Sequence, residues 1–156
     1  SFSFDSGSTD GWSGALAGTC GSRSILGGVS RFGGTAVASV SVAGIPAHTM
    51  LRVEMDVLAI DSWEAGDTYV VVVGGVEFGP YDQDGDLGGG TFVSASTDLC
   101  GAPEDPFGQP VGSGVDTVRH LQLDILHTGS SVDVEVRSGL DQSAGDESLG
   151  LDSVVV

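Results

Sequence analysis

Two short stretches of this sequence concentrate carboxylates among turn-forming residues, at positions 61–67 and 141–147. Their acidic side chains are Asp61, Glu64, Asp67, Asp141, Asp146 and Glu147. Carboxylates packed this densely repel one another, and a bound cation relieves that repulsion. Calcium takes about six to eight oxygen ligands, usually from several loops, so neither stretch suffices alone. We predict that the two stretches together hold a calcium ion; the alternative is that both are merely polar loops at one end of the fold.

A third acidic stretch, "DQDGDLGGGTFV", resembles the start of a helix–loop–helix calcium loop. Asp82, Asp84 and Asp86 match its first, third and fifth ligand positions. The match then fails, because Leu87 stands where glycine is required and Val93 where the bidentate glutamate is required. These three aspartates are a secondary metal candidate, and the alternative is a solvated acidic turn between two strands.

Catalytic motifs are missing from the sequence. It contains neither a G-x-S-x-G nucleophile motif nor an H-E-x-x-H zinc motif. The histidines His48, His120 and His127 are scattered, and we expect ordinary surface or edge residues rather than catalytic bases. With 22 acidic residues, carboxylate pairs are expected to meet by chance, so they do not indicate a glycosidase. We therefore predict no enzyme.

The net charge of −17 bounds the possible partners. Nucleic acids and anionic membrane surfaces need patches of Lys and Arg, so both are disfavoured. No run of about 18 apolar residues is present, and we expect no membrane insertion. The sequence contains no Lys, and two explanations remain: adaptation to high salt and a GC-rich genome.

Cys20 and Cys100 are the only cysteines. An even count in an acidic, glycine-rich chain predicts one disulfide and an oxidising, extracellular compartment. The alternative is two buried free thiols. No C-x-x-C motif or Cys/His cluster points to zinc.

Alternation of apolar and polar residues at 51–57, 121–125 and 132–136 predicts strands with one buried face. Glycine-rich or polar turns at 74–75 and 127–131 predict hairpins. Further strands are expected at 2–5, 24–27, 36–42, 68–73, 76–78, 91–96 and 150–155. Roughly ten short strands without helical periodicity predict an all-β, jelly-roll antiparallel β-sandwich, with residues 1–156 forming a single domain. A proline-rich stretch at 101–115 is expected to be a surface loop.

The sequence resembles a β-sandwich domain of secreted and surface proteins that is frequent in protists. The resemblance rests on segments spread in order along the chain: "FSFDSGSTDGWSG", "TCG", "ILGG", "IDSWEAGDTYVVV", "LCG" and "LDQSAGDESLGLDSVVV". More distantly, the first and last of these are similar to MAM and galactose-binding-like jelly rolls. The resemblance implies an extracellular, non-enzymatic jelly-roll module. It also makes the turns around Asp61 and around Asp146 and Glu147 the family's signature positions.

Two hypotheses of function follow. The leading one is a calcium-stabilised extracellular structural or adhesive module, a building block of a surface appendage, filament or large adhesin, whose partners are copies of itself or neighbouring domains. The alternative is a calcium-dependent carbohydrate-binding module, in which an exposed Trp63 would stack on a glycan. Trp12 and Trp63 both lie where a strand meets a turn, so packing in the core is the competing interpretation for each.

Overall fold

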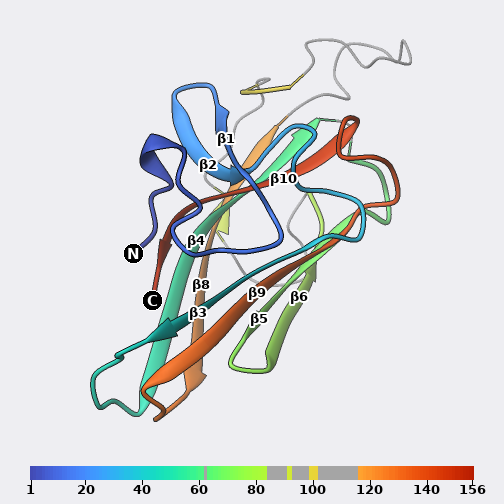
Figure 1. Ribbon diagram of the computed structural model, residues 1–156. Coiled ribbons are helices and arrows are strands. Elements are labelled where there is room, and N and C mark those ends of the chain that lie inside the picture. The colour runs from blue at the N-terminus through green and yellow to red at the C-terminus, as the bar shows by residue number, and fades with distance from the viewer. Residues whose placement is uncertain (62, 84–90, 93–98, 102–115) are drawn as a thin grey trace.

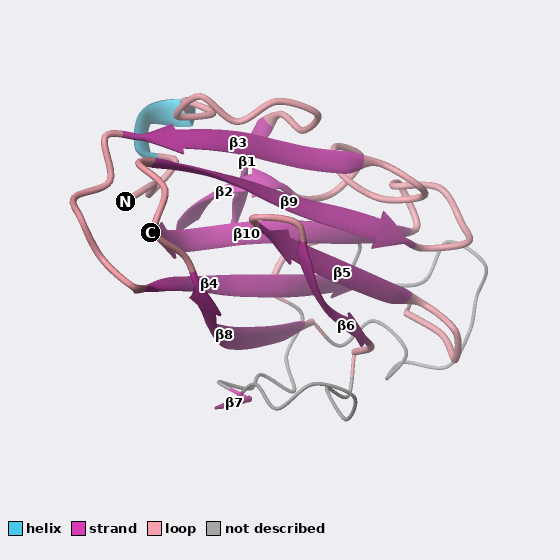
Figure 2. Cartoon of the chain, turned by 90° about the horizontal axis from the view of Figure 1, so that it is seen from below, coloured by secondary structure: helices cyan, strands magenta, loops and turns pink. Residues whose placement is uncertain are grey.

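The computed structural model describes residues 1–61, 63–83, 91–92, 99–101 and 116–156. Within this part, the strands form two antiparallel sheets that pack face to face (Figures 1 and 2). The one helical element described is a short 3-10 turn, η1, at Asp5–Gly7. The predicted all-β sandwich is therefore confirmed. No helix in the described ranges is long and apolar enough to span a lipid bilayer.

The larger sheet has the strand order β1-β2-β10-β4-β8-β7. Its strands are β1 (Ala17–Cys20), β2 (Arg23–Gly27), β10 (Glu147–Val155), β4 (Met50–Asp61), β8 (Thr117–Leu126) and β7 (Thr91–Phe92). The smaller sheet has the order β3-β9-β5-β6. Its strands are β3 (Val37–Ala43), β9 (Ser131–Gly139), β5 (Thr68–Val73) and β6 (Val76–Tyr81).

The alternation in β9 shows why these residues form a half-buried strand. Val132, Val134 and Val136 are at most 3% exposed and belong to the core between the sheets. Asp133 and Glu135 point to the other side, away from that core. Each buried valine contributes at most about 1.5–3 kcal/mol relative to an exposed one, and this sets the strand's register.

The last five residues of β4 are all buried, unlike its alternating first half. Val57 and Ala59 face the core between the two sheets. Leu58 and Ile60 face the opposite side and pack against Ile25 in a second, smaller apolar cluster. A strand that is covered on both faces has a continuous run of apolar residues, which explains why residues 57–60, "VLAI", do not alternate with polar ones.

The disulfide between Cys20 and Cys100 is confirmed. It joins the end of β1 to a segment 80 residues later in the chain. The alternative of two free thiols is thereby excluded.

The structure corrects two strand predictions. Residues 2–5 do not form a strand: Phe2 makes an isolated bridge to Val154, and Phe4 turns the chain into η1 with a φ of 56°. Strand β1 was not predicted, because its residues are small and its buried side is short. The strand expected at 91–96 is described only as β7, and the loop expected at 101–115 lies outside the described residues except for Gly101.

Strands β4 and β9 run the length of the sandwich and therefore define its two ends. At one end, β4 leads into the loop before β5, and β9 leads into residues 140–146 before β10 (Figure 1). We call this the acidic end. At the opposite end, residues 44–49 precede β4, residues 127–130 join β8 to β9, and residues 74–75 join β5 to β6. We call this the histidine end.

Candidate metal site

Asp67 organises the loop between β4 and β5. Its Oδ2 accepts a hydrogen bond from the backbone N–H of Glu64 at 2.5 Å, and its own N–H donates to the Glu64 carbonyl at 3.1 Å. Its Oδ1 accepts the backbone N–H of Asp141 at 3.3 Å. Asp67 is only 2% exposed. One carboxylate thus shapes its own loop and connects it to the loop before β10.

A tight turn before β10 positions Glu147. The backbone N–H groups of Asp146 and Glu147 both donate to the carbonyl of Ser143, at 2.8 and 3.1 Å. Successive side chains of a strand alternate between faces, so Glu147 lies on the same side as Leu149 and Leu151. Both leucines are fully buried in the core between the sheets. The glutamate therefore points inward at the end of the core rather than into solvent.

Asp67, Asp141 and Glu147 converge at the acidic end. Each offers a carboxylate oxygen, and the three oxygens lie within 4.8 Å of one another. Asp141 is exposed, while the other two are buried. The two loops are therefore brought together, and three of the six predicted ligands form the cluster; calcium binding there stays a prediction.

Glu147 is the exceptional member of this cluster. Its side chain is 0% exposed, and neither carboxylate oxygen has a hydrogen-bond partner among the described residues. Burial raises the pKa of the Glu147 carboxyl to about 7, and the negative charge of Asp67 adds to this rise. The backbone N–H of Gln142 lies near enough to lower the pKa of Glu147 but does not reach hydrogen-bonding geometry, and Asp141 and Asp146 raise the pKa further. The site thus holds an unusually costly negative charge.

The other three predicted ligands have different surroundings. The Glu64 side chain is at the rim, where its Oε1 accepts from Gln142 Nε2 at 3.3 Å. Asp146 is 7% exposed and close enough to affect the pKa of Glu147. Asp61 adopts a φ of 68°, and its carboxylate lies directly against Gly101, beside the disulfide segment. A side chain on Gly101 would collide with that carboxylate.

Asp116 is a structurally important residue that the sequence did not reveal. It is 0% exposed, and its Oδ1 accepts the backbone N–H of Asp61 at 2.9 Å. Its Oδ2 accepts the N–H groups of Leu99 and Cys100, both at 2.7 Å. Asp116 also lies close to both disulfide sulfurs, but these sulfurs are bonded to each other and do not form a metal-binding pair with it. Its role is to fix the segment that carries Cys100.

Of the three aspartates that form the secondary metal candidate, the structure describes one. Asp82 is half-buried, whereas Asp84 and Asp86 lie outside the described residues. Trp63 is 7% exposed; its indole N–H donates to the carbonyl of Ser148 at 3.1 Å, and its ring packs edge-on against Tyr69. Most of the ring is thus used in packing, and the stacking role of Trp63 stays a prediction.

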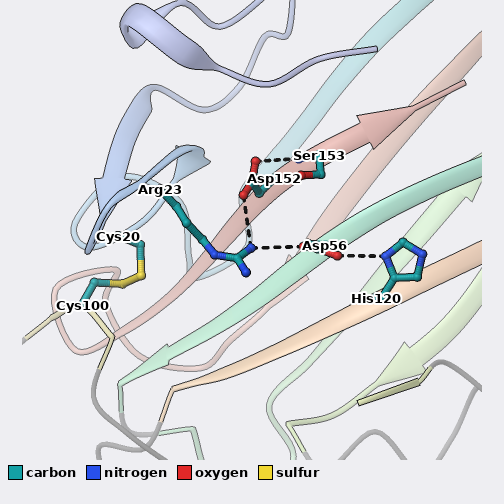
Figure 3. Close-up of polar contacts among 7 residues, drawn as sticks. All are labelled: Cys20, Arg23, Asp56, Cys100, His120, Asp152 and Ser153. Atoms are coloured by element: carbon teal, nitrogen blue, oxygen red, sulfur yellow. Dashed lines mark hydrogen bonds and ion pairs between the residues drawn. A yellow bond between two sulfur atoms is a disulfide. The ribbon is translucent and has the colours of Figure 1, made fainter. Parts of the chain in front are cut away.

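Charged side chains also connect strands on the outer face of the larger sheet (Figure 3). Arg23 Nη1 donates to Asp56 Oδ2 at 3.1 Å and to Asp152 Oδ2 at 3.2 Å. His120 Nδ1 lies 2.9 Å from Asp56 Oδ1. The arginine and the histidine are substantially exposed, so each pair contributes at most about 1 kcal/mol. This network links β2, β10, β4 and β8, and gives His120 a structural role.

Among known proteins, the chain is similar to solved structures but matches neither a family model nor a curated sequence. The similar structures include a cycloisomaltooligosaccharide glucanotransferase from Paenibacillus sp., at 12% identity and a TM-score of 0.47, over 99% of this chain but 17% of the other.

Two smaller domains are matched over most of their length. The CBM22-1 xylan-binding domain of Paenibacillus barcinonensis Xyn10C has 17% identity and a TM-score of 0.44, over 97% of this chain and 88% of the other. The CBM35 from Cellvibrio japonicus Abf62 has 9% identity and a TM-score of 0.39, over 88% and 80%. None of these similarities decides what this chain binds.

Proposed function

We propose that this chain is a non-enzymatic, extracellular structural or adhesive module, stabilised by a calcium ion between its two acidic loops. The observation that supports this most is Glu147, whose fully buried carboxylate has no hydrogen-bond partner among the described residues. An unsatisfied buried polar group costs about 1–3 kcal/mol, and more when it is charged. A cation beside Asp67 and Asp141 would offset that cost.

The chemistry of the three carboxylates suits calcium. If each bound through both oxygens, they would supply up to six ligand atoms, and calcium takes about six to eight. Both Asp67 oxygens already accept a backbone N–H, which fixes the carboxylate and leaves a lone pair on each oxygen. Magnesium requires near-octahedral geometry and keeps several waters, so a loop-built carboxylate cluster favours calcium.

Two features support an extracellular location, namely the disulfide and the kind of calcium site that is proposed. Disulfides such as Cys20–Cys100 persist in oxidising compartments. Extracellular modules typically bind calcium at about 10⁻⁴–10⁻³ M, an affinity that a site with one exposed ligand can reach. The absence of hydrolase motifs from the sequence supports a non-enzymatic role.

Thermal unfolding in EDTA and in millimolar calcium tests the calcium proposal. Millimolar calcium is about one to ten times a dissociation constant of 10⁻⁴–10⁻³ M, so it should add about 0.4–1.4 kcal/mol. Each kcal/mol raises Tm by about 2–4 °C in a domain of this size, and we therefore expect a gain of about 1–6 °C. Sodium chloride at equal ionic strength is the control, because screening alone relieves part of the repulsion of −17 charges. An equal gain in sodium chloride, or none in calcium, would reject the site.

The structural or adhesive role has its own test. Strand β6 is an edge of the smaller sheet, and a second copy could pair with it. The other edge strand, β3, is already paired with Ser13 of the same chain through Ser39. Light scattering and electron microscopy with and without calcium should then show concentration-dependent assembly. A chain that stays monomeric at high concentration in both conditions would argue against a building block that assembles by itself.

Carbohydrate binding is the second candidate. A cavity of about 330 Å³ is lined by Trp63, Glu64, Ala65, Gly66, Asp82 and Gln83, beside the acidic loops. It combines an aromatic edge with polar groups, which is the composition of a small-ligand site. A glycan array in calcium tests this function. The Gln83→Ala variant, which changes one residue that lines the cavity, is measured on the same array. Absence of binding in the array would eliminate it.

A further inference from the structure

The two histidines at the histidine end form a hydrogen-bonded pair. His48 Nε2 lies 2.8 Å from His127 Nδ1, although the residues are 79 positions apart in the chain. His48 Nδ1 lies 2.6 Å from the carbonyl oxygen of Pro46. His127 Nε2 lies 3.1 Å from the carbonyl oxygen of Ser131. All four ring nitrogens therefore take part in one continuous chain of contacts between two backbone carbonyls.

The two carbonyls determine where protons must lie. A carbonyl oxygen can only accept a hydrogen bond, so His48 Nδ1 and His127 Nε2 must each carry a hydrogen. A neutral imidazole has one N–H, so two neutral rings would leave bare lone pairs facing each other at 2.8 Å. Adding one proton converts that repulsive contact into a charge-assisted N–H···N hydrogen bond. All three contacts are satisfied together only when the pair holds one extra proton.

The ring geometry favours a proton over a metal ion between the two rings. The ring planes are inclined by 20°, and the centroids are 5.0 Å apart. That separation is close to the nitrogen–nitrogen distance plus the two ring radii, so the rings meet nearly edge to edge. A first-row metal between them would need about 2.0–2.1 Å to each nitrogen, which an in-line gap of 2.8 Å does not provide.

The pair joins two segments whose flanking residues are already paired in the sheets, Ala43 with Ser131 and Met50 with Leu126. The loop at 44–49 is held to the turn at 127–131 by two backbone hydrogen bonds, from Ile45 N–H to Ser130 O at 3.0 Å and from His127 N–H to Thr49 O at 3.3 Å. Both histidines are half-buried. The link between the rings therefore adds a side-chain contact to the backbone attachment at this end.

No other charge competes for the proton within the turns that pack here. Residues 44–49, 127–131 and 74–75 contain no further titratable or charged side chain. The charged residues farther along the same strands have partners of their own: Arg52 pairs with Asp124, and Asp133 accepts from Ser41. The state of the pair is therefore set mainly by the two imidazoles themselves.

We propose that His48 and His127 share a single proton and form a pH-sensitive clasp between the loop at 44–49 and the β8–β9 turn. Loss of the shared proton leaves two lone pairs opposed, and a second proton places two positive charges in contact. Either change weakens the clasp. This inference does not depend on the calcium site, which lies at the other end of the sandwich.

Nuclear magnetic resonance of the ring nitrogens tests the shared proton directly. In the wild type, the pair should take up its two protons in steps separated by more than about one pH unit, because the sites interact. His48→Gln should reduce the His127 titration to a single step, while His120 in the same spectra stays unchanged. Independent single-step titration of His48 and His127 in the wild type would overturn the proposal. So would tight binding of added Zn²⁺ by both rings.

A double-mutant cycle with His48→Gln and His127→Gln provides a second measurement. The coupling between the two positions should change the unfolding equilibrium constant by about tenfold at the pH where one proton is held, as expected for a charge-assisted bond. It should fall toward zero above and below that pH. A coupling that does not vary with pH would indicate packing alone and would contradict the clasp.

Discussion

Replacing Glu147 by Gln should stabilise the metal-free protein, which is the reverse of what most buried substitutions do. The folded state raises the pKa of this carboxyl from 4.5 to about 7. Above pH 7 the ionised group therefore costs the folded state about 3 kcal/mol, at about 1.4 kcal/mol per pH unit of displacement. Glutamine removes the charge, keeps the shape, and offers N–H donors to Asp67 and Asp141.

The sign of the pH dependence follows from the raised pKa. A carboxyl that holds its proton more tightly in the folded state causes no loss of stability below its unfolded pKa near 4.5. The loss grows as the pH rises and is complete above about 7. In EDTA, the free-energy difference between wild type and Glu147→Gln should thus be near zero at pH 4 and about 3 kcal/mol in favour of the variant at pH 8.

Urea unfolding in EDTA across this pH range measures the effect, and calcium should diminish it. Millimolar calcium should stabilise the wild type by more than the variant, so that the variant's advantage shrinks. Asp5→Asn is the matched control, since it removes one negative charge at an exposed position in η1. The reasoning would be refuted by a Glu147→Gln variant that is no more stable than wild type in EDTA at pH 8. It would also be refuted by equal calcium gains in both proteins.

Three further predictions concern single features of the structure. Asp141→Asn should leave the unfolding free energy in EDTA within about 0.5 kcal/mol of wild type, because Asp141 is exposed, yet remove most of the calcium-induced rise in Tm; a full rise would exclude Asp141 as a ligand. Changing Cys20 and Cys100 together to Ser should cost about 4–5 kcal/mol in urea unfolding, since the bridge spans 80 residues; a loss below about 1 kcal/mol would contradict the entropic account. Asp116→Asn should cost about 1–3 kcal/mol, because an amide cannot accept on both sides from the three N–H groups that Asp116 now satisfies; unchanged urea unfolding would show that the segment is held by other contacts.

The sequence predicted the strands in which apolar residues alternate with polar ones or form a continuous β-branched run. In β9, three valines alternate with polar residues, and the structure buries the valines while it leaves Asp133 exposed and Glu135 half-buried. Strand β1 escaped prediction because "AGTC" offers no such contrast. Conversely, "SFSF" alternates like a strand, but Phe4 adopts a positive φ and the following Asp-Ser-Gly favours a turn. The alternation of apolar and polar residues could not by itself distinguish the strand at β1 from the turn that follows Phe4.

For the site, composition located the acidic loops but could not choose among their ligands. Asp61 and Glu147 are opposite one another in the β4–β10 register, yet a φ of 68° turns Asp61 toward Gly101. Asp116 was missed because its partners are backbone amides of distant segments, which leave no spacing in the sequence. The histidine pair was missed for the same reason, since it depends on two turns, distant in the sequence, that meet at one end of the sandwich.

The central claim is that Asp67, Asp141 and Glu147 bind one calcium ion. Isothermal titration calorimetry of EDTA-stripped protein with calcium chloride tests it most directly, with the Asp141→Asn variant titrated beside the wild type. The account predicts one ion per chain for the wild type and binding at least tenfold weaker for the variant, as is typical when a carboxylate ligand is lost. No binding up to millimolar calcium, or equal binding by both proteins, would contradict it.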